Sequence, residues 1–145
     1  MWHNLKNCRI ICDKSGRLAQ VKKRFDVPYT DELRDSIIAN NMALLCGALP
    51  AYKGQIKKAL ARGDRVSILH RSTAFLESYF DIIFALNKLT HPGEKRLVEL
   101  CEQQCTVLPE NFRANLNGLF DVMFSEPEAV AHSIERIIDE LKRIM

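Results

Sequence analysis

The sequence predicts an all-α protein, an up-and-down bundle of four to six helices. Two observations support this fold class. Apolar residues recur at three- or four-residue steps through most of the chain, which is the spacing of one helix face. The segments that carry this pattern are joined by short connections, which favour antiparallel neighbours. We therefore expect one helical domain over residues 16–145, preceded by a short extended segment over residues 1–15.

Composition limits the class of protein. With 145 residues, of which 47% are hydrophobic, the chain can form one core but not two comfortable domains. The net charge of +3 is smaller than that of a dedicated nucleic-acid-binding domain. No apolar run approaches the ~18 residues of a membrane span, and five cysteines without a signal peptide fit reduced thiols. A cytoplasmic protein with no membrane partner is expected.

The N-terminal segment differs from the rest. Residues 7–18 form a β-prone run that ends in a turn at Gly16. A lone strand cannot pair with itself, so this run would add to a sheet that belongs to another domain. After Gly16 the sequence allows a short helix that Pro28 stops.

The first long helical pattern runs from Thr30 to Gly63. Thr30 is a plausible N-cap, and Gly63 a C-terminal stop. Pro50 lies inside the pattern, where it removes a backbone hydrogen bond and clashes with the preceding turn. A kink or break is therefore expected near residues 46–47.

The next helix, capped by Asp64 and running to about Leu89, has the widest apolar arc and is predicted to be central. We expect its main stripe, Leu69, Leu76, Phe80 and Ile83, at the centre of the core. Its thin polar stripe comprises His70, Glu77, Asp81 and Lys88. This stripe has two interpretations, a solvated edge or the wall of a groove that binds a ligand or partner.

Three further helical patterns follow the corner at residues 92–93. They begin near residue 94, at Pro109 and at a Ser-x-x-Glu capping box over residues 125–128. Cys101 and Cys105 share one helix face, which indicates apolar packing in preference to a zinc site.

Recognisable catalytic motifs are missing from the sequence. It contains no phosphate-cradling glycine-rich loop, no Gly-x-Ser-x-Gly elbow and no His-Glu-x-x-His. Paired carboxylates after a Gly-Ser turn, which would hold the metal of a nucleotide-transfer enzyme, are also missing. No catalytic residue and no metal ligand is predicted.

Three strings, at residues 79–81, 85–87 and 91–95, carry a family resemblance. Across residues 16–95 the chain resembles the helical C-terminal domain of a bacterial nucleotidyltransferase-like family, related in architecture to the substrate-binding helical domain of aminoglycoside nucleotidyltransferases. The resemblance implies a partner catalytic domain, in cis or in trans, that holds Mg and a nucleotide triphosphate. This chain lacks that domain, so residues 1–15 would be its remnant, and the chain a fragment or half of a split system.

The corner after the central helix is the candidate binding site. Asn87 falls on the apolar stripe, where an unpaired amide would cost about 1–3 kcal/mol. It either faces a substrate or domain, or serves the chain reversal. His91, Lys95 and Arg96 flank a helix start that would suit a phosphate. Two residues of the preceding helix would complete this substrate- or partner-binding edge, Tyr79 and Asp81.

Two alternative functions remain open. Arg65 and His70 have the Arg-x-x-x-x-His spacing of the RNase motif in HEPN domains, where His acts in acid–base chemistry and Arg stabilises phosphate charge. Val66 departs from that motif, because a polar residue usually follows the Arg. The other alternative is a purely structural or protein-interaction bundle, and a homo-oligomer is compatible with each function. The preferred expectation is a non-catalytic accessory domain that binds substrate, nucleotide or the catalytic domain.

Overall fold

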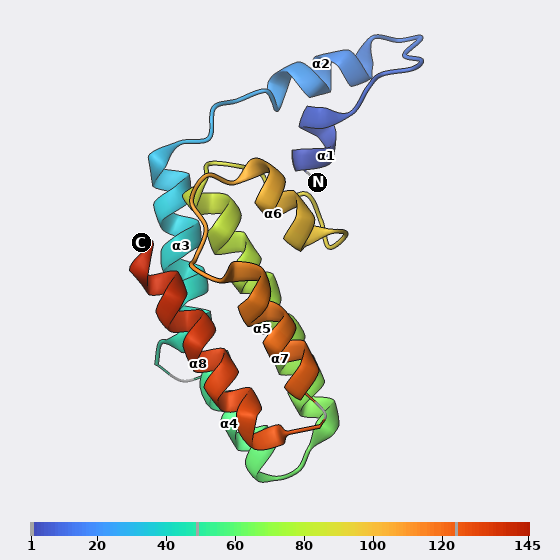
Figure 1. The fold of residues 1–145 in the computed structure, drawn as a ribbon. Helices are drawn as coiled ribbons and strands as arrows, with labels where there is room; N and C mark the ends of the chain where they lie inside the picture. The colour runs from blue at the N-terminus through green and yellow to red at the C-terminus, as the bar shows by residue number, and fades with distance from the viewer. Residues whose placement is uncertain (1, 49, 124) are drawn as a thin grey trace.

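The computed structural model describes residues 2–48, 50–123 and 125–145, and over them the protein is all-α, as predicted (Figure 1). The described residues form eight helices: α1 Trp2–Asn7, α2 Arg17–Arg24, α3 Asp31–Cys46, α4 Tyr52–Ala61, α5 Arg65–Leu86, α6 Leu97–Gln104, α7 Phe112–Val122 and α8 Pro127–Arg143. The expected number of four to six is wrong, because two short helices precede the bundle and the first long pattern forms two helices. None of the helices described is long and apolar enough to cross a membrane.

The N-terminal segment corrects the prediction of an extended strand. Residues 2–7 form α1, and Asn7 donates a side-chain hydrogen bond to the His3 carbonyl oxygen one turn earlier. Residues 8–15, all of which the structure describes, contain no strand. A β-prone run has no partner to pair with in this chain, so it forms an irregular connection to α2, which begins after Gly16 as expected.

The predicted break between α3 and α4 is confirmed. Thr30 caps α3 by accepting a hydrogen bond from the Leu33 N–H at 3.2 Å. The helix ends at Cys46, and α4 begins at Tyr52, beyond Pro50. Gly47 allows this ending, because a Cβ at that position would lie 2.7 Å from the Ala43 carbonyl oxygen.

Helix α5 is central, as predicted. Asp64 caps it by accepting from the Ser67 N–H at 3.1 Å. It contacts α3 and α4 extensively and α6 at its far end, while α7 and α8 pair with each other and α8 also contacts α4. Aromatic rings connect α5 to α7, since the rings of Tyr79 and Phe80 each lie 6.2 Å from the Phe112 ring, measured between centroids.

The core stripe of α5 is only partly as predicted. Phe80 and Ile83 are buried, but Leu76 is half-buried and Leu69 is 47% exposed. Ile68, one position earlier, is buried in its place. A long helix contacts different neighbours along its length, so the side that is buried changes from one end to the other. Residue spacing alone predicts a single straight stripe and therefore misses this change.

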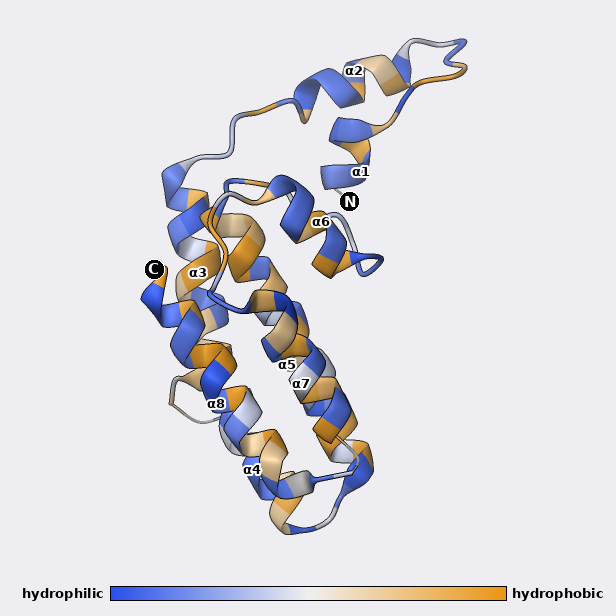
Figure 2. Cartoon of the chain, in the orientation of Figure 1, coloured by the Kyte–Doolittle hydropathy of each residue, from blue (hydrophilic) through white to orange (hydrophobic). Residues whose placement is uncertain are grey.

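Residues 2–30, here called the arm, extend from one end of the bundle formed by α3 to α8, with α1 near α6 (Figure 1). Within the described chain, neither α1 nor α2 contacts another helix extensively, and no residue of either is buried. The orange segments of α1, α2 and their connection are apolar residues outside the bundle (Figure 2).

Candidate functional site

The corner at residues 87–96 links α5 to α6, and its first residue has a structural role. The Asn87 amide donates to the carbonyl oxygens of Ile83 and Val107, both at 2.8 Å. Its Oδ1 accepts from the N–H groups of Thr106 and Val107, also at 2.8 Å. Asn87 therefore ties the end of α5 to the connection between α6 and α7. These bonds favour the chain-reversal interpretation over a ligand-facing amide.

His91 and Asp81 are brought together where the corner folds back over α5. The His91 ring meets Phe84 edge-on at 5.1 Å between centroids, and its Nδ1 accepts from the Gly93 N–H at 3.1 Å. Both His91 and Asp81 line two neighbouring hollows.

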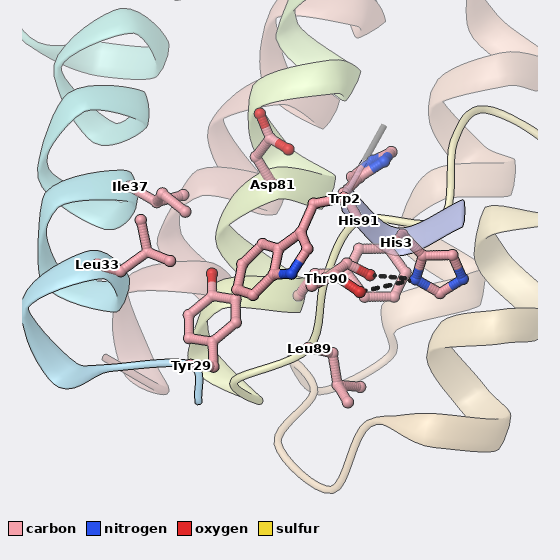
Figure 3. Close-up of a pocket in the computed structure, with 10 residues that line it drawn as sticks. Trp2, His3, Tyr29, Leu33, Ile37, Asp81, Leu89, Thr90 and His91 are labelled. Atoms are coloured by element: carbon pink, nitrogen blue, oxygen red, sulfur yellow. Dashed lines mark hydrogen bonds between the residues drawn. The ribbon is translucent and has the colours of Figure 1, made fainter. Parts of the chain in front are cut away.

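The first hollow, here called the arm pocket, has a volume of about 240 Å³ and lies between the arm and the bundle (Figure 3). Its lining comprises Trp2, His3, Tyr29, Leu33, Ile37, Asp81, Phe84, Leu89, Thr90 and His91. The Trp2 and Tyr29 rings stack at 5.6 Å between centroids. His3 Nδ1 lies 2.9 Å from the Thr90 carbonyl oxygen and 2.8 Å from its hydroxyl. The arm thus supplies one wall of the pocket.

The second hollow, here called the acidic groove, is larger, with a volume of about 600 Å³. Three carboxylates line it, those of Glu77, Asp81 and Glu94. Its other lining residues are Thr73, Leu76, Phe80, His91, Gly93 and Leu97. Among these described residues there is no Lys or Arg, so the groove is electrostatically suited to a cation.

Burial shifts the two shared groups toward their neutral forms. Burial raises the pKa of Asp81, and His91 acts in the opposite direction. Burial lowers the pKa of His91, whereas the nearby carboxylates of Asp81 and Glu77 raise it. Tyr29 also has a raised pKa, first because of burial and then because of Asp81. The lowered pKa of His91 favours a neutral imidazole at neutral pH.

Of the six residues proposed from the sequence, only Asp81 and His91 meet in the two hollows. Tyr79 is 2% exposed and stacks on Phe75 in the core, where burial raises its pKa, so it cannot reach a ligand at the surface. Lys95 and Arg96 are exposed at the start of α6, beside the groove, and neither is a lining residue.

The arm pocket also contains residues that sequence reasoning missed. Trp2, His3 and Tyr29 come from the arm, about 50 or more positions before Asp81 in the chain, and no local pattern links them to it. Glu94 could have been found, because it lies within the corner itself. Glu77 and Asp81 are four positions apart on one helix face, and they were visible as the polar stripe.

The residues of the alternative RNase motif lie elsewhere. Arg65 and His70 are exposed in the first turns of α5, at the opposite end from the corner. Five positions along an α-helix correspond to roughly 140° around its axis, so the two side chains leave the helix in different directions. Neither residue lines the arm pocket or the acidic groove.

The cysteines do not form a metal centre in the described residues, and no cluster of three or more His, Cys, Asp or Glu there is placed to hold a metal ion. Cys101 is buried, and Cys105 is half-buried one turn later. A hydrogen bond between the two thiols raises the pKa of Cys101 and lowers the pKa of Cys105. This pair belongs to the core packing of α6.

The molecule is therefore a helical domain whose central helix ends beside a carboxylate-lined groove. Residues 3–97, about two thirds of the chain, match the family described as a domain of unknown function (DUF4037), and the chain belongs to that family. Apart from Trp2, every residue that lines the two hollows lies within the match. No curated protein and no solved structure matches the chain.

Proposed function

We propose that this chain is a non-catalytic, substrate-binding helical domain of a nucleotidyltransferase-like system, and that its acidic groove binds a cationic substrate. The observation that carries the proposal is the common groove lined by Glu77, Asp81 and Glu94. Over residues 16–95, the resemblance to the helical domain of nucleotidyltransferase-like proteins supports the same assignment.

The charge of the groove supports a substrate and not the nucleotide. Three carboxylates would repel a triphosphate, whereas each attracts an ammonium group. One exposed ion pair contributes only about 0–1 kcal/mol, so useful affinity requires several carboxylates that act together. Glu77, Asp81 and Glu94 meet this requirement.

The apolar part of the groove narrows the substrate class further. Leu76, Phe80 and Leu97 lie among the carboxylates as lining residues. A simple metal cation would gain nothing from these side chains, whereas an organic polyamine or aminosugar can place carbon atoms against them. We therefore assign the groove to an organic molecule that carries more than one ammonium group.

The proposal leaves the chemical step to a separate domain. A nucleotidyltransferase catalytic domain, in cis or in trans, would hold Mg and the nucleotide triphosphate and transfer the nucleotide to the substrate that this chain presents. The purified chain is then expected neither to transfer nucleotides nor to cleave RNA. Lys95 and Arg96, exposed beside the groove, would face the anionic nucleotide triphosphate that the catalytic domain holds.

Titration of the isotope-labelled chain tests the proposal. Spermidine or kanamycin, added at physiological ionic strength, should shift the amide NMR signals of residues around Glu77, Asp81 and Glu94. The double variant Glu77→Gln/Glu94→Gln should lose about tenfold in affinity, which corresponds to about 1.4 kcal/mol.

The matched control is Glu32→Gln, which removes an exposed carboxylate from the first turn of α3 that lines neither hollow. It should bind both probes as the wild type does. An equal loss of affinity in the control variant would show that the probes bind through the overall charge of the protein and not through the groove. Shifts at the groove on addition of ATP, with none on addition of the cations, would overturn the assignment.

A further inference from the structure

The arm has an apolar surface that the rest of the described residues leave largely exposed. Ile11 is 88% exposed, and Phe25 and Val27 are each 46% exposed. Two hollows with mainly apolar linings, of about 470 and 520 Å³, share Trp2 and Phe25, and Val27 lines the larger one. The first of them lies between α1 and α2 and is lined by Trp2, Asn4, Leu5, Cys8, Val21 and Phe25. Exposed apolar area of this kind marks an interaction surface.

Positive charge lies beside this apolar surface, where the Lys6 ammonium lies over the Trp2 ring and Lys22 donates to the Cys8 carbonyl oxygen. Residues 1–30 carry seven Lys or Arg and only two Asp, although the whole chain has a net charge of only +3. Helix α2 alone contains four cationic residues and no acidic one. The arm is therefore suited to a partner that presents both carboxylates and an apolar side chain.

The C-terminal part of the same chain presents such a surface. Residues 97–145 carry nine Asp or Glu and four Lys or Arg. Asp121, Glu126, Glu128 and Asp139 are exposed on or between α7 and α8. Beside Asp121, Phe120 is 47% exposed. An exposed aromatic ring next to carboxylates complements an apolar hollow bordered by cations.

The arm does not lie on this surface in its own molecule. In Figure 1 the arm extends beyond the end of the bundle where α5 meets α6, whereas α7 ends near the opposite end of the bundle. No extensive contact between the arm helices and α7 or α8 occurs in the described residues. Contact between the arm and this surface would therefore require a second molecule.

We propose that the arm docks onto the face formed by α7 and α8 of a second copy of this chain. In this dimer the cations of α2 oppose the carboxylates near Asp121 and Glu128, and Phe120 enters the hollow between α1 and α2. Because each copy has one arm and one acceptor face, a two-fold axis lets both contacts form at once and closes the assembly as a dimer. This inference does not depend on the ligand of the acidic groove.

Other polyanions would attract the arm less selectively. Nucleic acid or an anionic membrane would use the cations of α2, but neither would require Phe120 or the carboxylates of α7 and α8. The apolar hollow and the opposite charge within one chain thus favour a second copy. Variants of the acceptor face therefore distinguish a second copy, whose binding they should weaken, from nucleic acid or a membrane, whose binding they should not affect.

Sedimentation equilibrium of the full chain tests the proposal. The wild type should dimerise, and high salt should weaken the dimer because screening reduces the attraction between arm and acceptor. Phe25→Ser in the arm and Phe120→Ser in the acceptor should each weaken dimerisation at least tenfold. Val66→Ser is the control, since it removes an apolar side chain that is 67% exposed on α5, outside both surfaces.

Charge reversal provides a second test that does not depend on apolar area. Lys23→Glu should weaken the dimer, and mixing that variant with Asp121→Lys should restore a heterodimer. Circular dichroism should show that each variant remains folded. A wild type that stays monomeric to millimolar concentration would overturn the proposal, as would dimerisation that both Ser variants leave unchanged. Binding of RNA or anionic vesicles by a monomeric chain would assign the arm to those partners instead.

Discussion

The arm and the central helix α5 both carry large apolar side chains, but these side chains have opposite environments. Helix α5 buries ten of its 22 residues, whereas no residue of α1 or α2 is buried in the described structure. Helices shorter than about 12–15 residues are marginal in isolation, and α2 has eight residues. The bundle helices are stabilised by burial against neighbours, while the arm helices are held by a few local contacts.

Those local contacts are concentrated at the junction with the bundle. The Trp2 indole donates to the Phe25 carbonyl oxygen at 2.9 Å, and its ring stacks on Tyr29. His3 contacts Thr90 in the corner. The arm is thus closed on itself by one aromatic side chain and fixed to the bundle near the candidate site. Its position, and with it the wall of the arm pocket, depends on few interactions.

The largest expected difference between the two regions is in stability. Phe75→Ala removes a fully buried ring of α5 and should lower the free energy of unfolding by about 3–5 kcal/mol. Phe25→Ala, the same change on the half-exposed ring of the arm, should lower it by less than about 1 kcal/mol. Chemical denaturation of both variants measures the contrast. Equal losses would mean that the arm folds as part of the core.

The corner should be the next most sensitive position. Asn87→Leu removes five hydrogen bonds and leaves backbone groups near Val107 without a partner, so a loss of about 1–3 kcal/mol is expected. Asn117→Leu is the control, because Asn117 is exposed on α7. If Asn87→Leu melts at the wild-type temperature, the amide does not stabilise the fold, and the interpretation that it faces a ligand is favoured instead.

The junction between arm and bundle should respond to a smaller change. His3→Ala removes the contact with Thr90, which is worth about 0.5–1.5 kcal/mol. The loss should appear as faster amide hydrogen exchange in α1, with α5 unaffected. Exchange that accelerates equally in both helices would show that arm and bundle open as one unit.

The pH dependence of the same junction follows from His91. Its pKa is lower in the folded protein than in the unfolded chain, so the unfolded state takes up the proton first as the pH falls. The stabilising contribution of the neutral ring is complete above pH ~6.5 and is lost as the pH falls through the lowered pKa. Thermal melts between pH 8 and 5 should show this decline, and His91→Gln should reduce it. An unchanged slope in the variant would assign the decline to other groups.

The smallest effect is expected at the exposed cations of the corner. Lys95→Ala removes a charge that lines neither hollow, and it should alter stability by no more than about 0–1 kcal/mol. Spermidine should bind this variant as it binds the wild type. The change should matter only for contact with an anionic ligand or with a catalytic domain supplied in trans. Weakened spermidine binding would contradict the position assigned to Lys95 beside the groove.

Part of the candidate site was predictable because its residues are close in sequence. Glu77 and Asp81 stand one turn apart on α5, and His91 follows in the corner, so helix periodicity and the turn place them on neighbouring surfaces. Tyr79 was placed in the site and lies in the core. The apolar stripe that contains Tyr79 borders the polar stripe of α5. Only the packing of α7 against α5 determines that Phe112 covers the Tyr79 ring.

The sequence by itself determined the helical class, the caps at Thr30 and Asp64, and the break that Pro50 imposes before α4. Each depends on interactions within a few residues, which the local order of side chains specifies. Only the tertiary structure decided that Trp2 and His3 line the same pocket as Asp81 and that no residue of α1 or α2 is buried in the described chain. Contacts between distant segments depend on how whole helices pack, and one surface can be covered by several neighbours that a local pattern does not distinguish.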